Sequence, residues 1–501
     1  MIKINDINNK YGLNNCNRWA TVNEIKNASE RIKFGDKDMK TAAGIPLLFD
    51  GENIYVDNTD SHTIIFGNTG AKKSRLLAMP LIHILAQGDE SLIIADPKGE
   101  LYERTSPYLN KNGYDISCIN LRDIGLGQVW NPLTNMYNLY KTNKDKGMEM
   151  ASDFVSLLID NGNDKKTTVA YDNFWDSMSG QLILANLQLL FETGLKEEIN
   201  IKSLTRLTNE YGEGDSLRKN RLYEIAQNIN RESLAYMQYS GLFNVAERTR
   251  FSIQASLYAI LSIFMLNSSL TNYLSQPNEI DVRKLKYKKS AVFIIFPDEK
   301  STYNKLVSIF LKEAYVMLIN ESQIMQRNGE KQIRCNFVLD EFANLPAITE
   351  FNSMISASRS REIRFFLFAQ SLNQLMSKYD TDADTIIGNC NNLVYLHSKE
   401  YKLLEHIERL CGEVTYYGEK ESVEPLISTT QLQHFSKEDG EALMLIGRNN
   451  PFVTRLKDID EYKFPRYKGF VQRRIIDRKA PILDCDKILS RFTPEQLSNL
   501  F

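Results

Sequence analysis

Short β-branched and aromatic runs alternate with helical patterns near the start of the chain. "HTIIFG" (62–67), "SLIIADPKGE" (91–100) and "YDISCINL" (114–121) have the composition of buried strands. "SRLLAMPLIHILAQ" (74–87), between the first two, has the apolar spacing of a helix. Strands that alternate with helices predict a mostly parallel sheet with helices on both faces.

The pattern changes in the middle of the chain. Residues 145–275 carry long helical segments and few strand-like runs, which predicts an all-α insert. Strand patterns then return at 290–297, 335–342, 363–371, 392–397 and 441–447, with a helical pattern at about 301–325. We therefore predict an α/β fold that an all-α domain interrupts.

Composition narrows the class of protein. A chain of 501 residues is too long for one core, so two or three domains are expected. The net charge of −2 leaves only a local basic patch for any nucleic acid. Six scattered cysteines without a C-x-x-C pair indicate reduced thiols in a cytosolic setting. We find no apolar run of about 18 residues and no signal peptide.

"FGNTGAKKSRLL" (66–77) is similar to a phosphate-binding loop with one residue changed. Gly67 and Lys73-Ser74 fit G-x-x-x-x-G-K-[ST], whereas the second glycine is Lys72. Between a strand and a helix, its backbone N–H groups would bind phosphate, with Lys73 on the β- and γ-phosphates and Ser74 on Mg²⁺. The predicted nucleotide-binding residues are Gly67, Asn68, Thr69, Gly70, Ala71, Lys72, Lys73, Ser74 and Arg75.

Two adjacent carboxylates end a later apolar strand, "FVLDEFANLP" (337–346). Burying a charged carboxylate away from water costs free energy, and a bound Mg²⁺ would offset that cost. We predict Asp340 and Ser74 as the metal-binding residues. Glu341 would polarise the attacking water as a general base. The alternative is an exposed acidic loop.

Polar residues at the next strand extend this pattern. Gln370 ends "IRFFLFAQS" (363–371), where it could sense the γ-phosphate or the water. Arg359, with Arg361 as second choice, could neutralise developing charge, from a neighbouring subunit if the protein forms a ring. The predicted catalytic residues are thus Glu341, Lys73, Gln370 and Arg359. Alone, Gln370 also fits an ordinary polar strand end, and each arginine also fits a solvated basic helix face. The loop that carries Lys73 also fits a turn of small residues before a surface helix.

The phosphate-loop pattern has glycine at the position of Lys72. A lysine there must either adopt αR-like backbone angles or bear backbone strain of roughly 1–3 kcal/mol. Its charge could attract the phosphates or crowd the pocket. Since the downstream acids remain, we expect ATP binding and hydrolysis, with activity reduced if the altered loop fits poorly.

Several segments together resemble the coupling proteins of type IV secretion, the conjugative DNA-transfer ATPases. The similar words are "NRWAT" (17–21), "IIADPKGELYERT" (93–105), "WNPL" (130–133), "DNFWD" (172–176), "ERTRFSI" (247–253), "LDEFANLP" (339–346), "AQSLNQL" (369–375), "IIGNCNNLVYL" (386–396) and "GEALMLIGRNNPF" (440–452). They occur in the family's order over roughly residues 15–468.

The resemblance implies a RecA-like P-loop NTPase motor domain interrupted by an all-α domain. It implies ATP and Mg²⁺ as cofactors, and single-stranded DNA, a relaxase–DNA complex and the secretion channel as partners. It also implies a homo-hexamer on the cytoplasmic face of the membrane. Because the usual N-terminal membrane helices are missing, we expect docking through a partner. The implied segments are 1–55, following those helices; 56–145 and 276–468, the nucleotide-binding domain; 146–275, the all-α domain; and 469–501, the tail.

Two other functions stay open. A nucleotide-binding adaptor that recruits cargo without hydrolysis is favoured by the altered loop and the missing anchor. A translocase for chromosome partition would share the motor chemistry, but the D-P-K-G-E and L-D-E-F-A-N-L words count against it. "SKEDGE" (436–441) is interpreted as solvated surface.

Overall fold

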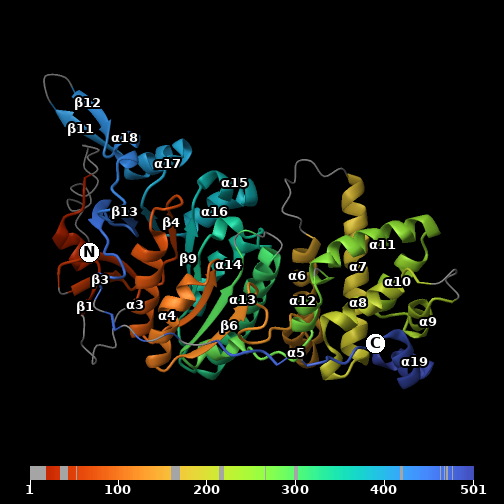
Figure 1. The fold of residues 1–501 in the computed structure, drawn as a ribbon. Coiled ribbons are helices and arrows are strands. Elements are labelled where there is room, and N and C mark those ends of the chain that lie inside the picture. Colours follow the sequence, from red (N-terminus) through yellow and green to blue (C-terminus); the bar gives the residue numbers. More distant parts are fainter. Residues whose placement is uncertain are drawn as a thin grey trace.

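The computed structural model has two lobes, a sheet lobe and a helical lobe, side by side (Figure 1). It describes residues 18–33, 43–51, 53–159, 170–213, 219–265, 267–297, 299, 303–417, 421–462, 464–465, 467, 469, 472–476 and 478–501.

Nine strands of the described chain form one sheet in the order β14-β13-β10-β4-β9-β8-β5-β7-β6. The strands from β10 to β6 are parallel to one another, and β13 and β14 are antiparallel additions at one edge. Their bounds are β4 (Thr63–Phe66), β5 (Ser91–Asp96), β6 (Asp115–Asn120), β7 (Ser290–Ile295), β8 (Cys335–Leu339), β9 (Ile363–Ala369), β10 (Asn392–Tyr395), β13 (Glu441–Ile446) and β14 (Phe452–Arg455). The predicted α/β fold, with all eight predicted strands, is confirmed.

Both faces of this sheet are buried, which explains why its strands read as continuous apolar runs. In β4, Ile64 and Phe66 join one hydrophobic cluster while Ile65 joins the other. The cluster around Ile65 is covered by α3 (Met79–Gln87) and α4 (Glu100–Lys111). The opposite face is covered by α13 (Asn304–Asn328), α14 (Phe351–Ser358), α15 (Leu372–Tyr379) and α16 (Asp382–Asn389).

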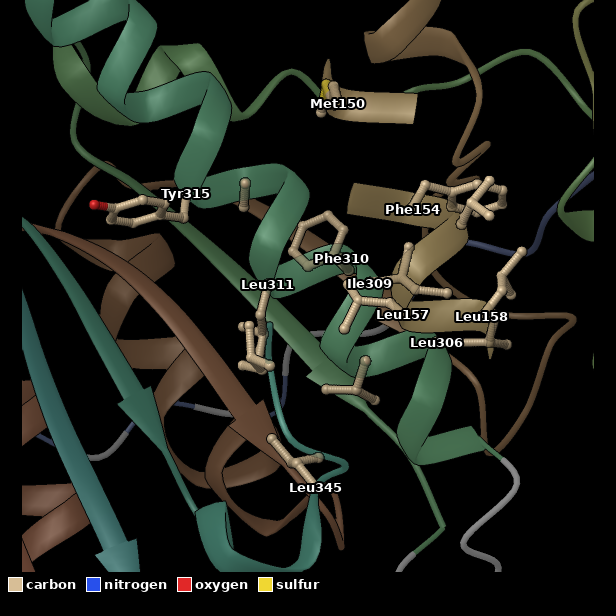
Figure 2. Packing of buried hydrophobic residues seen from close by; sticks show 14 of the residues in the cluster. Met150, Phe154, Leu157, Leu158, Leu306, Ile309, Phe310, Leu311, Tyr315 and Leu345 are labelled. Carbon is tan, nitrogen blue, oxygen red and sulfur yellow. The ribbon is translucent and has the colours of Figure 1, made fainter. Parts of the chain in front are cut away.

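The helical lobe is built from α5 to α12 (Figure 1). Their bounds are α5 (Thr134–Thr142), α6 (Lys144–Ile159), α7 (Ala170–Thr193), α8 (Ile201–Glu210), α9 (Arg221–Asn228), α10 (Leu234–Phe243), α11 (Glu247–Leu261) and α12 (Ser268–Tyr273). Helix α13 joins the lobes, since it covers the sheet and also packs against α6. Figure 2 shows Phe154 and Leu157 of α6 facing Ile309 and Phe310 of α13. A shared apolar core therefore connects the lobes.

Smaller elements lie outside the large sheet. Near the N-terminus, β3 pairs with β1 and β2 in a small sheet. Much later in the chain, β11 and β12 pair as a separate hairpin. Their bounds are β1 (Glu30–Lys33), β2 (Ile45–Phe49), β3 (Asn53–Asp57), β11 (Glu413–Tyr417) and β12 (Glu421–Pro425), and the flanking helices are α2 (Val22–Asn27), α17 (Tyr401–Cys411) and α18 (Thr429–Gln433). Neither these five strands nor β14 was expected from the sequence.

The described residues from 456 onward form a C-terminal strap that runs from one lobe to the other (Figure 1). It starts beside α3, where the Phe464 ring stacks on His83 with centroids 4.5 Å apart. It then passes β6, where Leu126 and Arg474 form an antiparallel bridge. It ends in α19 (Cys485–Arg491) and α20 (Pro494–Leu500), which pack on α9.

Ion pairs fasten the strap where it crosses to the helical lobe. Arg473 bonds Glu279 at 2.5 Å, on the segment that returns from α12 to the sheet. The Arg491 guanidinium donates to both oxygens of the buried Glu198 carboxylate, at 2.6 and 2.8 Å. The strap therefore contacts both lobes.

Five of the six cysteines are described, and all five are buried free thiols, which agrees with the expected reduced state; Cys16 lies outside the described residues. Within the described ranges, no helix is both long and apolar enough to span a bilayer.

Candidate nucleotide site

The predicted phosphate-binding loop, residues 67–74, lies where three parallel strands end. It follows β4, and two of its amides are fixed by the neighbouring strand ends: Gly67 N–H donates to the Ala369 carbonyl at 3.1 Å, and Asn68 N–H donates to the His397 carbonyl at 2.8 Å. The loop leads into a π-helical turn, Ser74–Ala78, and then into α3. This is the strand–loop–helix context that a phosphate site requires.

Lys73 points into this loop. Its Nζ donates to the Gly67 carbonyl at 2.7 Å and lies 3.8 Å from Glu341 Oε1, and the side chain is only 6% exposed. Burial lowers the pKa of Lys73, whereas the charges of Glu341 and Asp340 raise it. The ammonium thus lies at the centre of the loop with two carboxylates close to it.

Asp340 and Ser74 offer two neighbouring oxygens. Ser74 Oγ donates to Asp340 Oδ2 at 3.4 Å, and Asp340 Oδ1 accepts from the Glu341 N–H at 3.0 Å. Burial, and then the charge of Glu341, raise the pKa of Asp340 to about 6. A buried carboxylate beside a hydroxyl fits Mg²⁺, which prefers oxygen ligands and usually keeps water and phosphate oxygens as the others. No cluster of three or more His, Cys, Asp or Glu side chains suited to a metal occurs in the described chain.

Glu341 and Gln370 are joined in a chain of hydrogen bonds. Gln370 Nε2 donates to Glu341 Oε2 at 2.6 Å, and Gln370 Oε1 accepts from Thr69 Oγ1 at 2.8 Å. Glu341 has a left-handed backbone, with φ of +55°, a conformation that strains residues with a side chain. The chain of bonds therefore links the phosphate loop, through Gln370, to the predicted general base.

Two predicted nucleotide-binding side chains point to other partners. Lys72 Nζ donates to Glu438 Oε2 at 2.6 Å, and Lys72 has a φ of +58°, so the strained alternative is the one adopted. The Arg75 guanidinium bonds Asp458 at 2.7 and 2.5 Å and Asp460 at 2.6 Å. The structure thus does not bring either side chain into the group around Lys73. The "SKEDGE" stretch is not merely solvated surface, because Glu438 contacts the loop.

Arg359 and Arg361 lie just before β9, and Arg364 is its second residue, so all three are at the end of the sheet where the parallel strands begin. Arg359 pairs with Asp60, which precedes β4, at 3.2 Å, while Lys73 follows β4. Arg361 bonds the Ala357 carbonyl of its own helix at 2.7 Å. Arg364 is buried and pairs with Glu90 at 2.5 Å. Within one chain, therefore, Arg359 does not join the other predicted catalytic residues.

Sequence reasoning assigned no role to Asp96, the first residue of the D-P-K-G-E word. Its carboxylate accepts hydrogen bonds from the N–H groups of Gly99 and Tyr102, at 2.9 and 2.8 Å, and so shapes the turn into α4. Burial raises its pKa to about 7, and the charge of Asp340 adds to this. An aspartate that ends a buried strand was the available signal, as it was for Asp340.

The loop after β4, Asp340-Glu341 after β8 and Gln370 after β9 lie together at one end of a sheet that has the RecA-like P-loop NTPase fold. The family model for type IV secretory system conjugative DNA transfer matches residues 18–445, and the chain belongs to that family. The protein VirD4 of Rhizobium radiobacter is 22% identical over 418 residues, which are 80% of this chain and 55% of VirD4. The chain therefore spans about half the length of that relative.

Solved structures of the conjugative coupling protein TrwB have the same fold. The form of TrwB with the ATP analogue ADPNP has a TM-score of 0.63 at 15% identity and covers 92% of this chain and 97% of its own. The form with ADP and Mg²⁺ has the same score and identity, over 91% of this chain and 97% of its own. The form with sulphate also scores 0.63, at 16% identity, over 91% and 97%.

Proposed function

We propose that this chain is an ATP-driven coupling protein of a type IV secretion or conjugation system. It moves single-stranded DNA, with its attached relaxase, to the secretion channel. The observation that carries the proposal is the group formed by Lys73, Ser74, Asp340, Glu341 and Gln370, in a chain of the conjugative DNA transfer family. TrwB structures with ADPNP and with ADP and Mg²⁺ support ATP and Mg²⁺ as cofactors.

Each residue of the group has a role that its position supports. Lys73, inside the loop, neutralises charge on the β- and γ-phosphates. Ser74 and Asp340 would hold Mg²⁺, which would supply electrostatic stabilisation of the charge on the transferred phosphoryl group. Glu341 accepts a proton from the attacking water, and Gln370 orients the Glu341 carboxylate through its 2.6 Å hydrogen bond.

Arg359 takes part only in an assembly. Arg359 lies at the end of its own sheet opposite Lys73, so it is too far away to act on a nucleotide bound by the same chain. Arg359 therefore reaches a nucleotide that is bound by another copy of the chain. We propose a homo-hexameric ring in which Arg359 of one subunit completes the site of the next, with DNA and the channel components as partners. The ring acts at the cytoplasmic face of the membrane.

The domain boundaries follow the same proposal. Residues 56–145 and 276–468 form the motor domain, apart from α5, which lies in the helical lobe, and residues 146–275 form the all-α domain. The remaining segments are 1–55 and the tail 469–501. The strap contacts of Arg491 and Arg473 indicate that the tail belongs structurally with both domains.

A nucleotide-binding adaptor without hydrolysis is the second candidate. The observation that favours it is Lys72, a left-handed residue at a position where the phosphate-loop pattern has glycine. Hydrolysis of ATP by the purified chain, with and without single-stranded DNA, separates the two. Turnover that single-stranded DNA stimulates and that Glu341→Gln removes supports the motor. Nucleotide binding without turnover supports the adaptor.

A further inference from the structure

Lys72 lies in a conformation that its side chain makes costly. Its φ of +58° belongs to the left-handed region, which glycine occupies freely and other residues occupy at a cost. The Lys72 carbonyl accepts the Leu76 N–H at 2.8 Å, which connects the backbone of Lys72 to the helical turn that follows the loop. Gly70, two residues earlier, also has a positive φ, of +83°. Two positions of the loop thus have the left-handed backbone that glycine adopts freely, and one of them carries a lysine.

The Lys72 side chain leaves the loop toward the antiparallel edge of the sheet. Its Nζ donates to Glu438 Oε2 at 2.6 Å, and the two side chains are 32% and 70% exposed. The hydrogen bond from Lys72 lowers the pKa of Glu438. The ammonium is therefore paired with a carboxylate that comes from a different part of the chain.

Topology explains why Glu438 is available. Strand β13 is antiparallel to β10, so it starts at the end of the sheet where the parallel strands terminate. The turn before β13 therefore lies beside the phosphate loop. This turn is internally braced: the Ser436 N–H donates to Glu441 Oε2 at 2.9 Å, and the Ser436 hydroxyl accepts from the Asp439 N–H at 3.2 Å. Glu438 is thus held on a short, closed turn.

A second anchor of the same kind lies three residues further on. The Arg75 guanidinium bonds Asp458, and the Arg75 carbonyl accepts the Ile459 N–H at 3.1 Å. Asp458 follows β14, whose last residue, Arg455, pairs in register with Glu441 of β13. The outer side of the phosphate loop is therefore fastened to the antiparallel edge at two points, through Lys72 and Arg75.

We infer that Glu438 is a positioning residue that holds Lys72, and with it the phosphate loop, in the nucleotide-binding shape. This inference rests on the proposed function, because it assigns regulation of the same nucleotide site. Lys72 is then not a phosphate ligand, and the Lys72–Glu438 pair stabilises a backbone that glycine would adopt unaided. The alternative is that Lys72 binds phosphate and that Glu438 competes for it.

A double-mutant cycle on the full chain distinguishes these two roles of Lys72. The variants are Glu438→Gln, Lys72→Gly and the double variant, and the readout is the Kd of a fluorescent ADP analogue with Mg²⁺. The exposed carboxylate next to Glu438 in the same turn provides the control, Asp439→Asn. We expect Glu438→Gln to weaken binding about two- to fivefold, the range open to an exposed ion pair. The same change has no effect in the Lys72→Gly background, and Lys72→Gly alone binds at least as tightly as the wild type.

Two outcomes overturn the inference. One is tighter binding by Glu438→Gln together with loss of binding by Lys72→Gly, which makes Lys72 a phosphate ligand. The other is an equal loss from Glu438→Gln in both backgrounds, which makes Glu438 independent of Lys72.

Hydrogen exchange of the 67–76 segment without nucleotide gives a second readout. We expect Glu438→Gln to speed exchange there in the wild-type background and to leave exchange unchanged in the Lys72→Gly background. If none of the proteins binds or hydrolyses nucleotide, the proposed function fails, while exchange still decides whether Glu438 holds the loop. Equal exchange in wild type and Glu438→Gln overturns the inference by itself.

Discussion

Glu341 shares its two carboxylate oxygens between Gln370 and Lys73: Oε2 accepts from Gln370 at 2.6 Å, and Oε1 lies 3.8 Å from the Lys73 ammonium. Because a base removes a proton without holding the nucleotide, Glu341→Gln is expected to keep ADP affinity and to reduce ATP turnover by about 100-fold or more. Phosphate release and ADP binding, measured on the same sample, check this. Glu350→Gln is the control, since Glu350 is also left-handed but contacts Lys312. Unchanged turnover in Glu341→Gln would remove Glu341 from the mechanism.

Lys73→Ala is expected to weaken nucleotide binding and to reduce ATP turnover by about 100- to 1,000-fold, because the ammonium is the charge inside the phosphate loop. Titration with a fluorescent ATP analogue and a DNA-stimulated ATPase assay measure both effects. Lys111→Ala, at the exposed end of α4, is the control. Full DNA-stimulated turnover in Lys73→Ala contradicts the assignment.

Arg359→Ala is expected to lower turnover by about 1,000-fold if neighbouring subunits share a site. Because Arg359 and Lys73 lie at opposite edges of one sheet, an assembly mixed from Lys73→Ala and Arg359→Ala chains contains some interfaces with both residues intact. The mixture should therefore regain activity that neither variant has alone. Wild-type activity in Arg359→Ala would reduce its role to the pair with Asp60, and Arg361→Ala would then be tested in the same way.

Glu313 is expected to make stability fall as pH rises. It is buried on α13, where it accepts from Trp130 Nε1 at 2.9 Å and Asn135 Nδ2 at 2.5 Å, and burial raises its pKa to about 8. Between its ordinary pKa, near 4.3, and about 8, the folded chain keeps a proton that the unfolded chain loses, so the free energy of unfolding decreases with pH.

Glu313→Gln mimics the protonated acid, so its melting temperature should change less between pH 6 and pH 8 than that of the wild type. Melting curves at the two pH values measure the difference, with the exposed Glu424→Gln as control. The same pH dependence in Glu313→Gln and wild type would show that Glu313 does not titrate in this range.

Arg491→Ala is expected to lower the free energy of unfolding by about 1–3 kcal/mol, because it leaves the buried Glu198 carboxylate without its two hydrogen bonds from α19. Denaturant unfolding followed by circular dichroism measures the change. Arg478→Ala removes an exposed arginine of the same strap and should have little effect. Adding Glu198→Gln to Arg491→Ala should recover part of the loss, because the unpaired charge is then gone.

The sequence predicts the large sheet because burial on both faces leaves a clear mark. Ile64, Ile65 and Phe66 must all be apolar when each face of β4 is covered. The small N-terminal sheet leaves no such mark. Its strand β1 is "ERIK", in which Ile32 contributes to a core while Glu30 and Arg31 are exposed. Short edge strands of this kind depend on partners that the local sequence does not specify.

The positions of the candidate site residues were predictable where they follow strand ends, and not where they depend on pairing between distant parts of the chain. Asp340, Glu341 and Gln370 each end an apolar run, so their shared edge follows from a parallel sheet. The contact between Lys72 and Glu438 joins residues 366 positions apart, through the turn that precedes the antiparallel strand β13. The strand pattern predicts β13 but not its direction, and nothing local indicates which carboxylate the lysine meets.

The C-terminal strap is synthesised after the elements that it covers, and this determines the order in which parts of the fold are completed. Tyr462 and Phe464 complete the small hydrophobic cluster around Ile84 of α3, and Asp458 completes the bonds of Arg75. Domains fold largely as they emerge during synthesis. The helix behind the phosphate loop therefore leaves the ribosome almost four hundred residues before the segment that covers it. Until then Ile84 lacks the cover of these two rings and Arg75 lacks its carboxylate partner, so the outer side of the nucleotide site is among the last parts of the protein to reach its final form.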